Sequence, residues 1–186
     1  MSMSKKALVI LADGFEEIEA TAPIDILRRA EIQVTVAGLK DKTVTGAHGL
    51  KFQADIILNQ YQEVPDAVIL PGGMPGAQNL GHSKEVLEIL KYLNDQNKLI
   101  GAICAAPALA LAPAGILKGK KATCYPGFEK YFDSSIQFSD SRVVIDGNVI
   151  TSRGPGSAIE FALKLVEQLS GKEKSESLSQ GLLARA

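Results

Sequence analysis

The chain has 186 residues, of which 46% are hydrophobic and 22% are charged, a composition typical of a soluble globular protein with one domain. Its 20 basic and 21 acidic residues leave a net charge of −1, which predicts no nucleic-acid or anionic-membrane partner. The early apolar run ALVILA is too short for a signal peptide, and no run approaches the ~20 residues of a membrane-spanning helix. We therefore expect a cytoplasmic protein.

The first half of the chain alternates between β-rich and helical patterns. The polar stretch between the second and third strands is typical of a hairpin, because its glycines suit tight turns. The predicted elements are, in order, a strand KALVILA (6–12), a helix over about 17–30, a strand QVTVAGL (33–39), a hairpin TVTGAHGLKF (43–52), a strand DAVILP (66–71) and a helix SKEVLEILKYLNDQ (83–96).

The second half continues the alternation. Asp146-Gly147 predicts a two-residue hairpin, and Ser157 with Glu160 predicts a capping box at the start of a helix that ends at Gly171. The predicted elements are a strand LIGAI (99–103), a helix from Ala105, a short strand KKAT (120–123), strands RVVID (142–146) and NVITS (148–152), a helix over 157–169, and a short helix or frayed tail in the last ~13 residues.

Several of these strands are continuously apolar, as expected for parallel strands that are covered on both faces. With helices between them, they predict one domain: an α/β, three-layer α/β/α sandwich with a mostly parallel central sheet. In such sheets, binding sites form beyond the carboxyl ends of the strands. Three segments follow strand ends and are expected to line one crevice: DGFEEIE (13–19), PGGMPGA (71–77) and CAAPA (104–108).

Nucleotide binding does not fit this crevice. The chain contains neither a G-x-G-x-x-G nor a G-x-x-x-x-G-K-[ST] motif, and the acidic loop 13–19 would repel phosphate. The two cysteines and two histidines show no CxxC or HExxH spacing and are too few for a disulfide framework. We therefore expect no cofactor and no metal.

Cys104 is the residue in this crevice best suited to nucleophilic chemistry. A strand that turns abruptly into a helix presents the residue at the bend, as in a nucleophile elbow. The helix N-terminus would lower the thiol pKa from about 8.5, and Pro107 would fall in the first turn, where its missing N–H costs nothing. A buried structural thiol explains the spacing equally well, so the residues alone leave both interpretations open.

The other candidates also have two interpretations. Glu19 would serve as an acid or base beside the sulfur, or simply as a solvated acid at a helix start. Gly72 and Gly73 would point N–H groups at a developing oxyanion, or form a plain turn. Arg153 would bind an acidic group or pair with a neighbouring carboxylate, and Cys124 would be a small buried residue or a resolving thiol.

The segments ALVILADGFEEIEATAPIDILRRA, VILPGGMPGAQNL, GAICAAPALA and TSRGPGSAIEFAL occur in this order between about residues 5 and 173. Together they resemble the ThiJ/PfpI superfamily and, more closely, its DJ-one branch of parkinsonism-associated deglycases. The resemblance implies a flavodoxin-like fold and a homodimer whose site lies near the interface. It also implies that Cys104 is the reactive cysteine and Glu19 its carboxyl partner. Gly72, Gly73 and Ala105 would form the backbone pocket.

The chain departs from the family pattern at three positions. Ala105 stands where protease-like members have a histidine, and Tyr125 stands where the DJ-one protein has one, which disfavours a peptidase or amidase with a Cys–His–acid triad. His48 stands where the animal protein has an arginine that lines the pocket. Arg153 is then the retained basic group, and Tyr125 either touches substrate or packs.

The function implied is cysteine-dependent, cofactor-free chemistry on reactive dicarbonyls such as methylglyoxal, as a glyoxalase without glutathione, or deglycation of early adducts. Such an enzyme is a lyase or hydrolase with a Cys104 nucleophile and Glu19 as acid and base. The rival hypothesis is a non-enzymatic cysteine oxidation sensor, and a stress-protective chaperone is a third. Because the same two residues serve the first two hypotheses, the sequence does not separate them.

Overall fold

The computed structural model describes residues 4–184, and its centre is a seven-stranded sheet. The strand order is β10-β11-β7-β6-β1-β2-β5, and all neighbours are parallel except β10 and β11. The sheet strands are β1 (Lys6–Leu11), β2 (Gln33–Gly38), β5 (Ile56–Ile57), β6 (Ala67–Leu70), β7 (Leu99–Ile103), β10 (Val143–Asp146) and β11 (Val149–Ser152).

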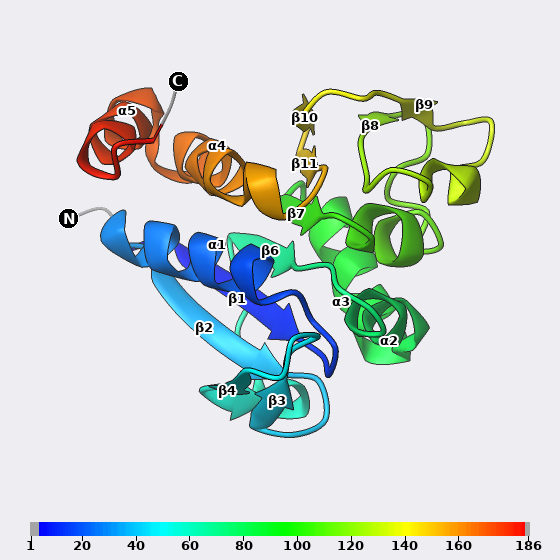
Figure 1. The fold of residues 1–186 in the computed structure, drawn as a ribbon, viewed down its shortest axis with the longest axis horizontal. Helices are drawn as coiled ribbons and strands as arrows, with labels where there is room; N and C mark the ends of the chain where they lie inside the picture. The colour runs from blue at the N-terminus through cyan, green and yellow to red at the C-terminus, as the bar shows by residue number, and fades with distance from the viewer. Residues whose placement is uncertain (1–3, 185–186) are drawn as a thin grey trace.

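Helices cover both faces of this sheet (Figure 1). Helices α1 (Glu17–Arg29) and α4 (Ala158–Ser170) pack against each other on one face, and α2 (Gly76–His82) and α3 (Lys84–Asp95) lie on the other. The last helix, α5 (Lys172–Gly181), packs on α4. The predicted flavodoxin-like three-layer sandwich is therefore confirmed.

The remaining elements are short. Strands β3 (Thr43–Thr45) and β4 (Lys51–Gln53) pair antiparallel, as the hairpin pattern predicts. A second two-stranded sheet joins β8 (Lys121–Ala122), which lies within the predicted short strand 120–123, to β9 (Gln137–Phe138) in parallel. The short elements that the sequence pattern misses are η1 (Leu58–Gln60), η3 (Glu129–Tyr131), η4 (Pro155–Ser157), β5 and β9.

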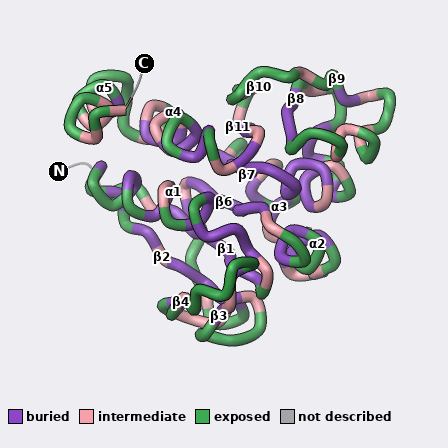
Figure 2. The backbone as a smooth tube through the Cα atoms, viewed as in Figure 1, coloured by how far each residue is buried: buried purple, intermediate pink, exposed green. Residues whose placement is uncertain are grey.

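The core lies where the apolar runs predict it. All four residues of β6 and all five of β7 are buried, and Figure 2 shows these central strands buried while the β3–β4 hairpin is largely exposed. The face of α4 that meets the sheet is formed by Ala158, Phe161, Ala162, Leu165 and Val166. Burial on both faces explains why the strands tolerate no alternation of polar residues.

Two predicted details of the helices are wrong. Ser157 does not form a capping box with Glu160, because its hydroxyl donates to the Gly154 carbonyl at 2.9 Å and Glu160 accepts from Arg142 instead. The sequence pattern also misses α2, which is seven residues long and contains Gly76 and Gly81. So short a helix has no clear apolar period, and glycine lowers helix propensity.

The tail forms α5 as one of its two expected outcomes, and residues 185–186 of that tail lie outside the described part of the chain. Within residues 4–184, none of the helices has both the length and the apolar character needed to cross a bilayer.

The order of the strands in the sheet gives the position of the expected crevice. Read along the parallel strands, the order β2-β1-β6-β7-β11 reverses direction between β1 and β6. Ligands bind outside the carboxyl ends of strands at such a reversal. The loops after β1, β6 and β7 are the three segments that the sequence analysis assigned to one crevice.

Candidate active site

Cys104 lies at a sharp bend directly after β7. Its φ of 65° is in the left-handed region, which a residue with a side chain enters only at some cost in strain. Two hydrogen bonds hold it there: its N–H donates to the Ser152 carbonyl at 2.9 Å, and its carbonyl accepts from the Tyr125 N–H at 2.8 Å. The predicted elbow is therefore present, and β11 and the loop at Tyr125 hold it in shape.

The helix expected after Cys104 is not an α-helix. The segment forms a five-residue π-helix, η2 (Pro107–Leu111), in which the Ala112 N–H donates to the Pro107 carbonyl. Pro107 opens this helix, where its missing N–H costs nothing, and Ala112, the residue before Pro113, keeps helical backbone angles of φ −62° and ψ −51°.

Glu19 lies in the first turn of α1 and is fully buried. The Glu16 carboxylate caps this turn by accepting the Glu19 N–H at 2.8 Å, which fixes the start of the helix. Glu19 Oε2 accepts the Gly72 N–H at 2.9 Å. Its other oxygen, Oε1, has no hydrogen-bond partner among the described residues. Glu19 is therefore not the solvated acid that the sequence left open.

Gly72 brings Glu19 and Cys104 together. A Cβ atom at this position would lie 2.5 Å from Cys104 Cβ and 2.7 Å from Glu19 Oε2, distances that real Cβ atoms essentially never show. Only glycine therefore fits between the carboxyl group and the cysteine. The Gly72 N–H, expected to face an oxyanion, is instead occupied by Glu19 and positions the acid.

The Glu19 carboxyl group titrates in the neutral range. Its net pKa is raised to about 7, chiefly by burial. A hydrogen bond with the Cys104 thiol and one from the Gly72 N–H lower this pKa, and the negative charge of Glu16 raises it. Cations are absent from these influences, which is why the shift is upward. A carboxyl group with such a pKa exchanges protons readily at neutral pH.

The expected lowering of the Cys104 pKa is wrong. The residue is 8% exposed, and burial together with the negative charge of Glu19 raises the thiol pKa to about 12. Hydrogen bonds from the Gly73 and Ala105 N–H groups act in the opposite direction. Because each group influences the other, their titrations are coupled: Glu19 loses its proton first, near pH 7, and its charge then helps to keep the thiol protonated.

The three residues considered as substrate-binding, Tyr125, Arg153 and His48, have different surroundings in the structure. Tyr125 is 45% exposed, and its ring lies against Gly154 at the edge of the Glu19 side chain. Arg153 donates through Nη1 to the Asp140 carbonyl at 2.8 Å, which is a structural contact. Its nearby charge lowers the pKa of Cys124, which burial and Glu129 raise to about 12.

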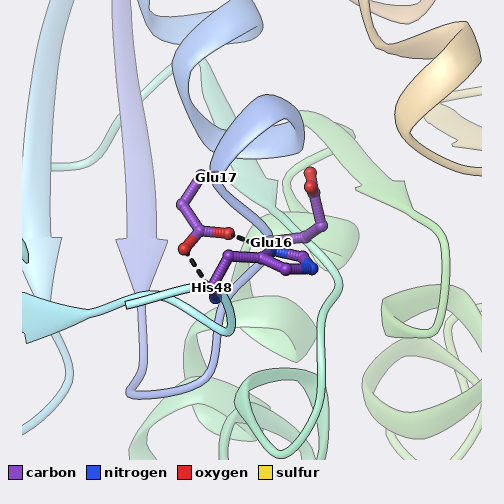
Figure 3. A group of neighbouring side chains, drawn as sticks. All are labelled: Glu16, Glu17 and His48. Carbon is purple, nitrogen blue, oxygen red and sulfur yellow. Dashed lines mark hydrogen bonds and ion pairs between the residues drawn. The ribbon is translucent and has the colours of Figure 1, made fainter. Parts of the chain in front are cut away.

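His48 pairs with the start of α1 rather than with Cys104. Its ring Nδ1 lies 2.8 Å from Glu17 Oε2, and the backbone N–H of His48 donates to Glu17 Oε1 (Figure 3). Burial raises the pKa of Glu17, but the hydrogen bonds from His48 lower it on balance, and those same contacts raise the pKa of His48. The sequence around Glu16 and Glu17 does not predict this contact, because His48 lies 31 positions from Glu17 in the chain.

Three potential metal-ligand atoms, one each from Glu16, Glu17 and His48, lie within 4.8 Å of one another. No metal is expected from the sequence, because its cysteines and histidines show no CxxC or HExxH spacing. Both carboxylates already accept hydrogen bonds from the chain itself, Glu16 from Glu19 and Glu17 from His48. These bonds account for the cluster as a brace between α1 and the β3–β4 hairpin.

This fold, with a strained cysteine at a strand end and a buried glutamate beside it, defines a class of α/β cysteine proteins. The model of the DJ-1/PfpI family matches residues 5–168. The chain belongs to the DJ-1/PfpI family.

Known proteins resemble the whole chain. Protein dj-1beta of Drosophila melanogaster is 45% identical over 97% of this chain and 98% of its own length. Its crystal structure superposes with a TM-score of 0.95 over 99% of this chain and 100% of that chain. A Caenorhabditis elegans protein, the glutathione-independent glyoxalase DJR-1.2, is 40% identical over 98% of both chains.

Plant relatives are longer than this chain. Protein DJ-1 homolog B of Arabidopsis thaliana is 44% identical over 99% of this chain, and the match covers 42% of that protein. The chain thus spans under half the length of this relative, so the activity of the longer protein bears on this chain only as a proposal.

Proposed function

We propose that the protein converts small reactive dicarbonyls such as methylglyoxal to hydroxy acids without a cofactor, with Cys104 as nucleophile and Glu19 as acid and base. The observation that carries the proposal is the buried Cys104–Glu19 pair, joined through Gly72. The same pair would remove fresh glycation adducts, in which an amine or thiol is attached to the same carbonyl carbon. The glyoxalase name of the C. elegans relative supports this choice.

The first step forms a carbon–sulfur bond. Glu19 as carboxylate takes the thiol proton while the Cys104 sulfur attacks the aldehyde carbon, and that proton then neutralises the aldehyde oxygen. The product is a hemithioacetal. The Gly73 and Ala105 N–H groups, which point at the sulfur, are placed to stabilise negative charge as it develops there.

The second step moves a proton between two carbons. Glu19 removes the hydrogen of the former aldehyde carbon, which gives an enediol, and returns a proton to the adjacent carbon. The result is a thioester of lactate on Cys104. Water then hydrolyses the thioester and releases lactate and the free thiol, so that methylglyoxal and water are consumed and no oxidant is needed.

A histidine-dependent peptidase mechanism has little support. His48 is engaged by Glu17, and His82 lies at the end of α2. A Cys–His–acid triad requires an imidazole within hydrogen-bond reach of the sulfur. The Cys104 thiol has Glu19 as its titrating hydrogen-bond partner instead.

The test is incubation with methylglyoxal in thiol-free buffer, with lactate followed by a chiral assay. We expect Cys104→Ser to reduce turnover at least about a thousandfold, because a serine hydroxyl is not deprotonated by a group of pKa near 7. The matched control is Cys124→Ser, which changes the other buried cysteine and should retain turnover. Turnover that persists in Cys104→Ser contradicts the mechanism.

A second function, oxidation sensing, is favoured by the surroundings of the sulfur. The protonated Glu19 carboxyl and the Gly73 and Ala105 N–H groups would all donate to the oxygens of a sulfinate. Mass spectrometry after mild peroxide tests it: two oxygens added at Cys104 with no dicarbonyl turnover would replace the enzymatic proposal with the sensor.

We also propose a cytoplasmic homodimer, as the family resemblance implies. Ile18, beside Glu19 on α1, is 54% exposed, and Leu50 on the hairpin is 65% exposed. Apolar side chains that exposed are suited to an interface close to the site. Light scattering on the purified protein should give the dimer mass and Ile18→Glu the monomer mass; a monomeric wild type would contradict the proposal.

A further inference from the structure

Thr151 is a buried polar residue in a strand whose other positions are also buried. It is the third residue of β11, all four residues of which are buried, and its own exposed fraction is 1%. A buried hydroxyl group is unfavourable unless it is hydrogen-bonded, and valine has nearly the same shape without this cost. Thr151 Oγ1 accepts the Thr123 N–H at 2.9 Å. The reason for threonine therefore lies in what this bond holds.

The bond holds the segment 121–125, whose first residues form β8 and lie beside β10 (Figure 1). In an extended segment, N–H groups two residues apart point to the same side. The three bonds on the side of the large sheet run from the Lys121 N–H to Asp146 Oδ2 at 2.8 Å, from the Thr123 N–H to Thr151 Oγ1 at 2.9 Å and from the Tyr125 N–H to the Cys104 carbonyl at 2.8 Å. The segment 121–125 thus connects β10 and β11 with the elbow after β7.

The bond to Thr151 is the firmer of the two bonds that precede Tyr125. The bond to Asp146 is exposed, whereas the bond to Thr151 is buried. Water competes for an exposed hydrogen bond, and a buried hydrogen bond is electrostatically stronger. Thr151 is also the closer of the two in sequence, because its partner Thr123 lies two residues before Tyr125. We therefore expect Thr151 to determine where the Tyr125 N–H lies.

The Tyr125 N–H acts on the strained backbone of Cys104. With a φ of 65°, Cys104 stays in the left-handed region only while its surroundings hold it there. The Ser152 carbonyl accepts the Cys104 N–H on one side, and Ser152 is itself fixed by the ladder between β11 and β7. On the other side, the Cys104 carbonyl accepts from Tyr125, which lies outside the strands. This second hold depends on the segment 121–125.

We propose that Thr151 is a positioning residue for the Cys104 nucleophile: its hydroxyl group fixes the segment 121–125, and this segment holds the Cys104 carbonyl through the Tyr125 N–H. The effect on turnover rests on the proposed function, whereas the hold on Tyr125 does not. Thr123 provides the contrast, because its own hydroxyl group is buried and has no hydrogen-bond partner among the described residues.

The kinetic test compares Thr151→Val with Thr123→Val, which each replace one buried hydroxyl group by a methyl group. Thr151→Val leaves the Thr123 N–H without its acceptor, so the segment 121–125 shifts. We expect kcat for methylglyoxal to fall about tenfold or more and KM to stay within about twofold, since a small misplacement of a reacting group slows the chemical step. Thr151→Ser keeps the acceptor and should restore most of kcat, and Thr123→Val should stay within about twofold of the wild type.

Amide hydrogen exchange at Tyr125, followed by NMR, tests the hold without a substrate. We expect the Tyr125 N–H to exchange at least about tenfold faster in Thr151→Val than in Thr123→Val, because its bond to Cys104 opens more often. The N–H of Ile69, in the central strand β6, is the internal reference for global unfolding. The measured quantity is the ratio of the two exchange rates, so a general loss of stability does not produce the expected result.

The outcomes separate this inference from the proposed function. Wild-type kcat and an unchanged exchange ratio in Thr151→Val overturn the inference and leave the function intact. A lower kcat with an unchanged ratio also overturns it, because Thr151 would then act by another route. If the wild type turns over no dicarbonyl, the function fails and the exchange ratio decides the inference. If Thr151→Val does not fold, Asp146→Ala, which removes the exposed bond of the same segment, takes its place: a raised ratio supports the inference, and an unchanged ratio overturns it.

Discussion

Two carboxyl groups at opposite edges of the same sheet have opposite properties. Asp66, just before β6, accepts the Lys6 N–H at 3.0 Å and lies 3.0 Å from Lys98 Nζ, with Lys5 also near. Burial raises its pKa, but these contacts outweigh burial and lower it. Glu19, at the edge where β6 ends, has no cation, and burial raises its pKa to about 7.

The difference arises from the charged groups that surround the carboxyl group at each edge of the sheet. Lysines at the amino-terminal edge keep Asp66 ionised, so that it serves structure by holding the ends of two strands. At the carboxyl-terminal edge, Glu19 has only N–H and thiol donors and no cation, so burial lets it keep its proton up to about pH 7. A buried carboxyl group without a cation is costly to the fold and useful to chemistry.

The largest expected effect is on turnover. Glu19→Gln keeps the shape but accepts no proton, so it should lower kcat for methylglyoxal at least about a hundredfold, the usual contribution of a positioned acid or base. The contrast between Glu19 and Asp66 would be contradicted if Asp66→Asn, the same chemical change at the other edge, lowered kcat by a similar factor. We expect it to remain within about twofold of the wild type, as for other changes remote from a reacting centre.

Stability as a function of pH gives the next effect. The folded-state pKa of Glu19 lies above its ordinary 4.5, so its contribution to stability is complete below pH 4.5 and is lost as pH rises through about 7. The loss amounts to about 3 kcal/mol. Denaturant unfolding should therefore show Glu19→Gln gaining stability over the wild type, by up to this amount, between pH 4.5 and 8.

Asp66→Asn should show the opposite sign. The folded-state pKa of Asp66 is lowered from 3.8, so its contribution is present above that pH and is lost as pH falls through the folded-state value. The variant should be less stable than the wild type at pH 7, by about 1 kcal/mol for a partly exposed pair, and equal to it in strong acid. The same sign of change in both variants would mean that the two edges do not differ as described.

The sequence predicts the layers and the bend, because both depend on local patterns. Continuous apolar runs mark β1 and β6 as buried parallel strands, and small residues around Cys104 allow the left-handed turn that the structure contains. The sequence pattern fails to predict local structure where contacts between residues distant in sequence determine it. Ser157 bonds Gly154 and the side chain of Ser152 instead of capping α4, because β11 brings Ser152 to it.

The electrostatics of the site are less accessible to sequence. A helix after Cys104 suggests a lowered thiol pKa, but that segment is a π-helix, and burial beside Glu19 raises the pKa instead. The degree of burial and the absence of a cation depend on the whole crevice. The pairing of His48 with Glu17 likewise arises only when the β3–β4 hairpin meets the start of α1.

The central claim is that the buried Glu19 carboxyl group controls the ionisation of Cys104, and the pH dependence of Cys104 alkylation tests it most directly. Iodoacetamide modification, measured by mass spectrometry in a Cys124→Ser background, should rise with pH about a midpoint above 9.0, the ordinary pKa of a thiol, because burial and the charge of Glu19 raise the pKa of Cys104. In Glu19→Gln the negative charge beside the thiol is removed, so we expect the midpoint to move down by about one pH unit or more, while Asp66→Asn leaves it unchanged. An identical midpoint in the wild type and Glu19→Gln would contradict the account.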